Sequence, residues 1–169
     1  LINNKRKVLG INPGATYGSS KRWYPKEFAQ VAVELSLDYD IIIFGGQDEV
    51  NLALDIEKLL IKKGIKNYKN LAGKTSIEDL ISRISSLDLF ITADSGPMHL
   101  AASFEIPTVA IFGPTNSNET SQWKLEKSIV VKKQLECQPC MKRTCPLKHH
   151  NCMKLIKASD VLKAVESIV

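Results

Sequence analysis

The stretch Leu89-Phe90-Ile91-Thr92-Ala93-Asp94-Ser95-Gly96-Pro97-Met98-His99 contains the pattern that decides the fold. Its first four residues form an apolar, β-branched run that is typical of a buried strand. Pro97 suits the first turn of a helix, where its missing N–H costs nothing, so a helix is predicted over Gly96–Phe104. A strand followed directly by a helix indicates a βα unit of a parallel sheet.

The same alternation continues in both directions along the chain. Further strands are predicted at Val8–Asn12, Ile41–Phe44, Tyr68–Leu71, Thr108–Phe112 and Ile129–Val131. Further helices are predicted from Pro25, from Asp48 to about Lys63, from Ser76 with Ile77, Leu80, Ile81 and Ile84 facing inward, and near the end with Ser159 or Asp160 as cap. The pattern predicts a doubly wound, Rossmann-like α/β fold, with ligands bound at the carboxyl ends of the strands.

The composition predicts a globular protein with one domain over residues 1–169. Apolar residues make up 44% of the 169 residues, and no apolar run approaches the roughly 20 needed to span a bilayer. Residues 1–120 carry 13 Lys and Arg against 14 Asp and Glu, whereas residues 121–169 carry 10 against 4. This basic end suits a phosphorylated substrate, nucleic acid or an anionic membrane surface, and equally a solvated lysine-rich face.

The loop Pro13–Trp23 follows the first predicted strand and has the parts of a phosphate site. Gly14 allows close backbone approach, Thr16 offers a hydroxyl, and Lys21 and Arg22 are adjacent cations. The spacing is not that of a Walker A loop, and no Gly-x-Gly-x-x-Gly fingerprint occurs in the chain. A glycine-rich surface turn with a solvated cation pair is the alternative.

The second loop joins the strand at Leu89 to the following helix. Free N–H groups of Ser95, Gly96 and Met98 are expected to point out of the helix start, towards an anion. Asp94 serves either as an N-cap or as an acceptor for sugar hydroxyls. His99 is either a packed core residue or close enough to reach a phosphate oxygen.

A third loop, Gly45–Glu49, places acids just after a buried strand. Nucleotide-binding sheets hold ribose hydroxyls at this position, so Glu49, with Asp48 as the alternative, is a candidate ribose ligand. A helix N-cap with an acidic first turn explains the same residues without a ligand.

All four cysteines fall within 16 residues, in a cysteine-rich loop over residues 137–152: Cys137, Cys140, Cys145 and Cys152. Clustered soft ligands suggest a structural zinc ion, and Cys137, Cys140, Cys145 and His150 approach zinc-knuckle spacing. Free buried thiols are an equal alternative. Disulfides are the remaining, less expected alternative.

Four motifs occur in order and together resemble glycosyltransferase family 9, most closely its ADP-heptose–lipopolysaccharide heptosyltransferases of type II. They are Asn12–Ala15 with Lys21–Trp23, Asn70–Ser76, Asp94–Ala102 and Phe112–Thr115. The resemblance covers essentially the whole chain and implies the C-terminal, donor-binding half of a GT-B enzyme. Since Leu1 is neither an initiator Met nor the start of a signal sequence, a piece of a longer polypeptide is expected.

The resemblance also implies roles for individual residues. Lys21 matches the lysine that contacts the donor's diphosphate, with Thr16 in the loop before it. Glu49 matches the ribose-binding acid, and Thr75 falls where the family holds adenine through backbone atoms. The motif Asp94, Ser95, Gly96 and His99 matches the one that grips heptose and diphosphate.

The expected reaction is inverting transfer of heptose from ADP-heptose to the lipopolysaccharide core, with no cofactor needed for catalysis. Lys21 would stabilise the transition state, while the general base and the acceptor site would lie in the N-terminal half, so no catalytic residue is assigned here. A cytoplasmic location is expected, with peripheral contact at the inner membrane. The rival predictions are a basic, zinc-knuckle-like nucleic-acid-binding module and another nucleotide-sugar enzyme on the same fold.

Overall fold

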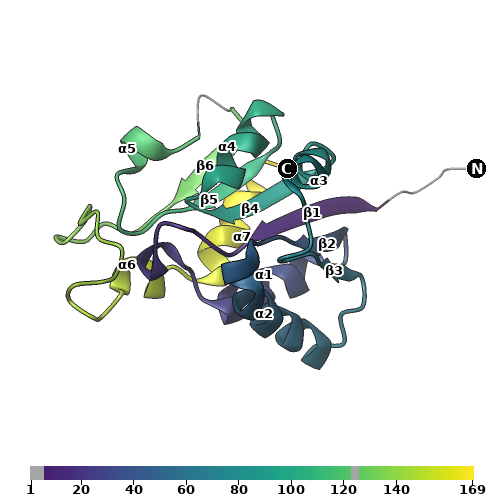
Figure 1. Cartoon of the computed structure of the whole chain (residues 1–169), viewed down its shortest axis with the longest axis horizontal. Coiled ribbons are helices and arrows are strands. Elements are labelled where there is room, and N and C mark those ends of the chain that lie inside the picture. Colours follow the sequence, from purple (N-terminus) through teal and green to yellow (C-terminus); the bar gives the residue numbers. More distant parts are fainter. Residues whose placement is uncertain (1–5, 123–125) are drawn as a thin grey trace, which may run out of the picture.

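Six parallel strands form one sheet in the computed structural model, which describes residues 6–122 and 126–169 (Figure 1). The strand order is β3-β2-β1-β4-β5-β6, so the chain starts in the middle of the sheet and winds outward first to one edge and then to the other. This is the predicted doubly wound, Rossmann-like α/β fold. The reversal of direction between β1 and β4 opens a crevice at the carboxyl ends of these two strands.

The strands are β1 Lys7–Asn12, β2 Tyr39–Ile43, β3 Tyr68–Asn70, β4 Leu89–Ala93, β5 Thr108–Ile111 and β6 Ser128–Val131. The helices are α1 Pro25–Leu35, α2 Val50–Lys62, α3 Ile77–Ile84, α4 Gly96–Ser103, α5 Ser117–Thr120, α6 Asn151–Lys154 and α7 Ala158–Glu166. Two 3-10 turns, Ser19–Lys21 and Gln47–Glu49, lie in the loops after β1 and β2. The short helices α5 and α6 carry too few periodic residues to be predicted.

Two apolar layers hold the helices on the sheet. Helices α1, α2 and α7 cover one face, where Phe28, Ile56 and Val161 are fully buried against strand residues such as Ile11. Helices α3 and α4 cover the other face, over a smaller cluster that includes Phe90. Burial on both faces explains why the central strands read as continuous apolar runs. No helix among the described residues is long and apolar enough to cross a membrane.

Two local predictions were wrong, and in both cases the reason is the residue at which the helix begins. Ile77, predicted to face inward, is 73% exposed, because α3 begins at this residue and only its later turns reach the sheet. The last helix begins at Ala158, so neither Ser159 nor Asp160 is its cap. Asp160 instead accepts a hydrogen bond from the Lys157 N–H at 2.9 Å and pairs with Lys133 near β6.

Candidate functional site

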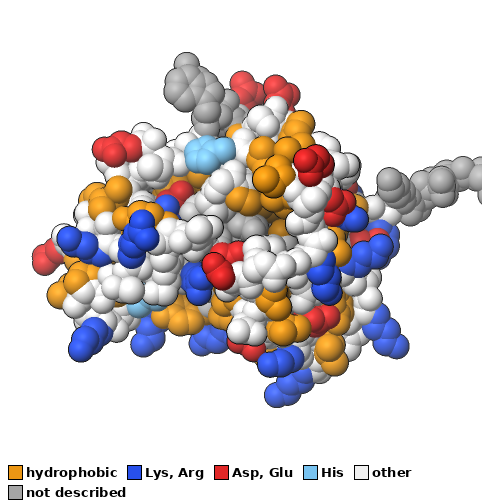
Figure 2. Space-filling model, viewed as in Figure 1, with side chains coloured by type: hydrophobic (Ala, Val, Ile, Leu, Met, Phe, Trp, Pro, Cys, Tyr) orange, Lys and Arg blue, Asp and Glu red, His pale blue; other side chains and the backbone are white. Residues whose placement is uncertain are grey.

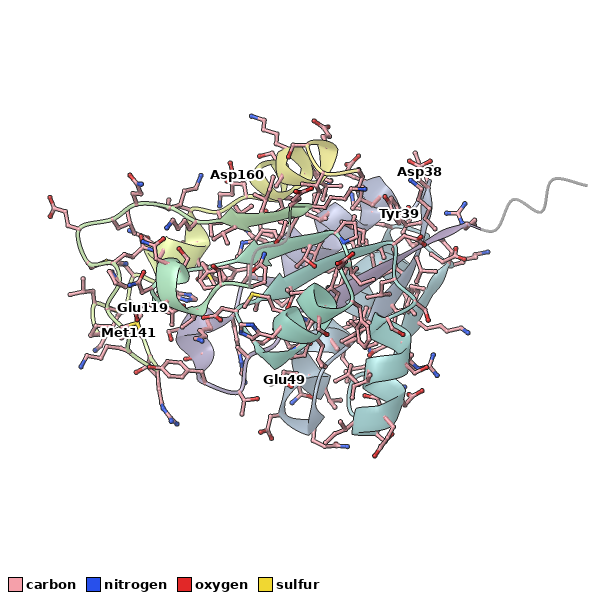
Figure 3. All side chains as sticks on the ribbon, turned by 90° about the horizontal axis from the view of Figure 1, so that it is seen from above. Asp38, Tyr39, Glu49, Glu119, Met141 and Asp160 are labelled. Carbon is pink, nitrogen blue, oxygen red and sulfur yellow. The ribbon has the colours of Figure 1, made fainter. Side chains whose placement is uncertain are left out.

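A cleft of about 430 Å³ opens at the carboxyl ends of β1 and β4. Most of the residues predicted for the site contribute to its walls. The lining residues are Asn12, Gly14, Ala15, Thr16, Tyr17, Lys21, Gly46, Glu49, Asp94, Ser95, Gly96, Pro97, His99 and Thr120. Figure 3 places Glu49 far from Asp38 and Tyr39, which lie where β2 begins, so the cleft and the start of the strands are at opposite ends of the sheet.

A buried ion pair crosses this cleft. Lys21 Nζ lies 2.6 Å from Asp94 Oδ2, and the two side chains are 11% and 4% exposed. Thr115, in the loop after β5, donates its hydroxyl to the same carboxylate oxygen at 2.6 Å. Both contacts use Oδ2, so Oδ1 is the oxygen left without a hydrogen bond from any described residue. Asp94 is therefore a fixed acceptor with one oxygen open to a ligand.

Asn12 ties together the loops on the two sides of the cleft. It ends β1 and is buried, and its Nδ2 lies 3.0 Å from Ser95 Oγ and 3.3 Å from both Thr92 Oγ1 and the Gly14 carbonyl oxygen. These contacts link the glycine loop after β1 to the start of α4. Because the cross-link spans more than 80 residues of sequence, no local pattern indicated it.

Glu49 enters the cleft from the loop after β2. Its Oε2 accepts the Gly46 N–H at 2.6 Å, and its side chain packs against Gly14 so closely that a Cβ at position 14 would lie 1.9 Å from Glu49 Cγ. Gly14 is therefore required for this close approach. Asp48, the alternative candidate, is not among the residues that line the cleft.

The N-terminus of α4 faces the same space. A Cβ added to Gly96 would meet nothing within 4 Å, so there is room for a ligand at the helix start. The Met98 N–H is not free as predicted, because it donates to the Ser95 carbonyl oxygen at 3.1 Å. His99 is exposed and lines the cleft, which excludes its interpretation as a packed core residue.

Two predicted participants lie outside the lining of the cleft. Thr75 follows a loop held against residues 45 and 46 by the hydrogen bond from Gly73 N to the Gly45 carbonyl oxygen, 2.9 Å. Arg22 was expected to act beside Lys21, but its Nε is buried without a described hydrogen-bond partner. Adjacent side chains leave a 3-10 turn in different directions, so only one of the two cations reaches the cleft.

Residues 2–151 match the family described as glycosyltransferase family 9 (heptosyltransferase). The chain belongs to this family. Lipooligosaccharide heptosyltransferase 2 of Campylobacter jejuni is 48% identical over 170 residues, which cover 100% of this chain and 53% of that protein. Lipopolysaccharide heptosyltransferase 2 of Salmonella typhimurium is 32% identical over 120 residues, which cover 70% of this chain and 34% of that protein. The chain thus spans about half the length of the first of these relatives.

The solved structure of Escherichia coli ADP-heptose lps heptosyltransferase II is similar over 96% of this chain and 46% of its own, with a TM-score of 0.81 and 26% identity. The six-stranded sheet is therefore the fold of about half of a family 9 enzyme. Neither the family nor its structures support the nucleic-acid alternative. On the face seen in Figure 2, Lys and Arg side chains alternate with acidic and apolar ones instead of forming a continuous basic stripe.

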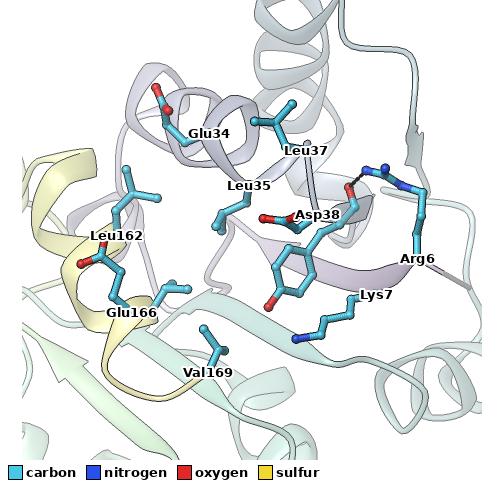
Figure 4. Close-up of a pocket in the computed structure, with 11 residues that line it drawn as sticks. Arg6, Lys7, Glu34, Leu35, Leu37, Asp38, Leu162, Glu166 and Val169 are labelled. Carbon is cyan, nitrogen blue, oxygen red and sulfur yellow. Dashed lines mark hydrogen bonds between the residues drawn. The ribbon is translucent and has the colours of Figure 1, made fainter. Parts of the chain in front are cut away.

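A second, larger cleft of about 840 Å³ lies at the amino ends of the strands (Figure 4). Lys7 and Tyr39, the first residues of β1 and β2, line it together with α7 residues such as Leu162 and Glu166. Arg6, one of the two cations in its lining, already donates to the Asp40 carboxylate at 2.8 Å. Doubly wound sheets bind their ligands at the carboxyl ends of the strands, so the smaller cleft, where the glycine loop and the start of α4 meet, is the better candidate site.

The four cysteines of this family 9 chain are free and line one small cavity behind the glycine loop. Burial, and then the nearness of Cys140, Cys145 and Cys137, raises the pKa of the Cys152 thiol to about 11. Among the described residues no three or more His, Cys, Asp or Glu side chains are arranged so as to hold a metal ion. Both ring nitrogens of His150 are already hydrogen-bonded, so it is not the open ligand that the zinc-knuckle spacing suggested.

Proposed function

We propose that residues 1–169 form the donor-binding domain of an inverting, GT-B-type heptosyltransferase that uses ADP-heptose to extend the lipopolysaccharide or lipooligosaccharide core. The observation that carries the proposal is the convergence of Lys21, Glu49, Asp94 and the start of α4 on one cleft. The relatives' names as heptosyltransferases and their identity to this chain support the choice of sugar and acceptor.

The diphosphate would lie between Lys21 and the first turn of α4. A cation and unpaired backbone N–H groups near Ser95 and Gly96 are suited to two phosphate groups. Negative charge grows on the leaving diphosphate during transfer, so these groups would stabilise the transition state more than the ground state. Lys21 is already held at Asp94, 2.6 Å away, so the ion pair keeps the lysine extended into the cleft before the donor arrives.

The rest of the donor would occupy the two flanks of the cleft. Glu49, held by the Gly46 N–H, would accept the ribose hydroxyls, while backbone atoms beside Thr75 would hold the adenine. Thr16 is exposed at the rim and would donate its hydroxyl to phosphate or sugar. His99, one turn into α4, would reach a phosphate oxygen from the opposite wall.

The heptose would lie against Asp94, whose open oxygen suits a sugar hydroxyl. The acidic and imidazole groups that line the cleft, Glu49, Asp94 and His99, are all assigned to holding the donor, so none of them is left to act as the general base. An inverting displacement needs its base on the opposite face of the anomeric carbon, so the base would come from a facing domain together with the acceptor. We place the enzyme in the cytoplasm, in peripheral contact with the inner membrane that carries the lipid acceptor.

Calorimetric titration of the 169-residue chain with ADP, UDP and GDP tests the proposal. We expect weak binding with a preference for ADP, and we expect Lys21→Ala to weaken ADP binding by about 1–3 kcal/mol, the range for a lost hydrogen bond to a charged group. Lys62→Ala, at an exposed lysine of α2 outside the cleft and outside the motifs of the site, is the matched control and should leave ADP binding unchanged. A preference for UDP would overturn the assignment of the donor.

The reaction as proposed needs no metal, and a structural zinc ion on Cys137, Cys140, Cys145 and Cys152 is a separate proposal. The support for it is that all four thiols border one cavity. As placed, the thiols do not surround a common point, so zinc binding would require them to turn inward. No step of the transfer is routed through this ion.

A further inference from the structure

The segment Met141–His150 lies directly behind the turn that carries Lys21. In Figure 1 the loop after β1 runs beside α6, although more than 120 residues separate them in sequence. The Tyr17 hydroxyl donates to the Met141 carbonyl oxygen at 2.7 Å, and the Ser20 N–H donates to the Arg143 carbonyl oxygen at 3.1 Å. These bonds hold the turn through main-chain groups of the segment.

The backbones of the turn and the segment are in direct contact at Gly18 and Ser20. A Cβ added to Gly18 would lie 2.3 Å from the Arg143 carbonyl oxygen, so only glycine allows the two backbones to approach this closely. The Ser20 side chain is buried and donates its hydroxyl to the Lys142 carbonyl oxygen at 2.5 Å. A displacement of the segment would therefore displace the turn.

His150 closes this contact with both of its ring nitrogens. Nε2 lies 2.8 Å from the Ser20 carbonyl oxygen, and Nδ1 lies 3.0 Å from the Tyr24 hydroxyl. A carbonyl oxygen only accepts, so Nε2 must carry a proton, and in the neutral ring Nδ1 then accepts from the tyrosine. The imidazole thus bonds the residue immediately before Lys21 and a residue shortly after it.

The position of the Lys21 ammonium depends on this backbone. A lysine side chain has a limited reach and prefers staggered rotamers, so the position and direction of its Cα–Cβ bond limit which acceptors its ammonium can reach. The Lys21 ammonium reaches Asp94 in the cleft, and Lys21 as a whole is only 9% exposed. Fixing the Ser20 carbonyl fixes the peptide unit from which Lys21 begins.

We propose that His150 is a positioning residue of the donor site, which holds the Ser20 carbonyl and thereby aims Lys21 at the donor's diphosphate. The inference rests on the proposed function, since it assumes that Lys21 binds the diphosphate. The cysteine-rich loop then supports the donor site from behind, through its contacts with the turn that carries Lys21. Its four cysteines would affect donor binding only indirectly, by holding this loop against the turn.

A double-mutant cycle on the 169-residue chain tests the inference, with ADP affinity read by calorimetry or by NMR shift titration. We expect His150→Ala to weaken ADP binding about 3- to 10-fold, in line with the loss of the neutral hydrogen bond to the Ser20 carbonyl, the one of its two bonds that holds the turn. In the Lys21→Ala background the same substitution should change the affinity less than 2-fold, because the group it positions is gone. A loss of general stability would weaken binding equally in both backgrounds.

His149→Ala is the matched control, since His149 lies in the same segment and its Nδ1 accepts only a local bond from Asn151 N at 3.0 Å. It should leave ADP affinity within 2-fold of the parent. If His150→Ala does not fold, Tyr24→Phe replaces it, because that change removes only the hydroxyl that orients the imidazole. We expect a loss of about 2- to 3-fold that disappears in the Lys21→Ala background.

The outcomes separate the inference from the function on which it rests. If the parent chain binds no adenine nucleotide, the proposed function fails at the first titration. If the parent binds ADP and the losses at His150 and Lys21 simply add, or if the folded His150→Ala or Tyr24→Phe variant binds like the parent, His150 is not a positioning residue.

Discussion

Replacing Lys21 by methionine removes the cation of the buried ion pair while keeping a side chain of similar length. The Asp94 carboxylate, 4% exposed, then retains only the Thr115 hydroxyl at 2.6 Å. Breaking a buried pair on one side typically costs about 3–5 kcal/mol, since a charge is left without compensation. The cleft admits water and Thr115 keeps its bond, so we expect a loss near the lower end, about 3 kcal/mol.

Urea unfolding of the chain at pH 7, followed by circular dichroism, measures this loss. Lys58→Met is the matched control, because the Lys58–Asp55 pair has its charged groups 3.2 Å apart but its side chains 74% and 57% exposed. That control should lose less than about 1 kcal/mol. The double variant Lys21→Met with Asp94→Asn should recover most of the stability, since it buries no unpaired charge.

The result that would refute this reasoning is a loss for Lys21→Met no larger than that for Lys58→Met. It would mean that Asp94 is well solvated without its lysine and that the pair does not hold Lys21 in the cleft. The same conclusion would follow if the stability losses of Lys21→Met and Asp94→Asn simply add in the double variant, because the losses of two interacting residues are not additive.

Three further predictions follow from the fold and the site. The chain alone should release ADP from ADP-heptose no faster than buffer does, even with a heptose-bearing lipid present; transfer abolished by Asp94→Asn would show that Asp94 is the base. If zinc binds, metal analysis of protein prepared without chelator should give about one equivalent, and Cys140→Ser should destabilise the terminal segment; metal-free protein whose melting temperature is unchanged by chelator would contradict zinc. Burial raises the pKa of Asp160, but the Lys157 N–H and the Lys133 ammonium outweigh it and hold that pKa below the ordinary 3.8. Asp160→Asn should therefore lower the free energy of unfolding by about 0.5–1 kcal/mol at pH 7. The difference in stability between the parent and the variant should disappear as the pH falls below about 4, and a difference independent of pH would contradict this.

The order and type of the main elements could be predicted because their causes are local. Pro25 begins α1 as predicted, Ser76 caps α3 by accepting from the Asp79 N–H at 3.1 Å, and Gly64 ends the turn after α2 with a φ of 74°. Each of these signals acts within a few residues of its own position. The predicted sheet is correct for the same reason, since strands that alternate with helices have few other ways to pack.

The sequence also located the loops of the site, because a parallel sheet brings the residues after its strands to one edge. Spacing and residue type alone left open which residue of an adjacent pair enters the cleft, and only the family resemblance selected Lys21 and Glu49. Lys21 does and Arg22 does not, and Glu49 does and Asp48 does not. The choice depends on the local backbone turn and on how closely neighbouring loops pack, as at Gly14 and Glu49.

Tertiary structure alone supplied the partners that give these side chains their positions. Thr115 reaches Asp94 across 21 residues of sequence, and Asn12 reaches Ser95 across 83. His150 reaches Ser20 across 130 residues. A single sequence shows clearly the spacing of its apolar residues and the residues that begin or end helices and turns, because these features act within one helical turn or one strand. It carries no comparable signal for a hydrogen bond between distant loops, because such a bond exists only once the sheet has brought the loops together.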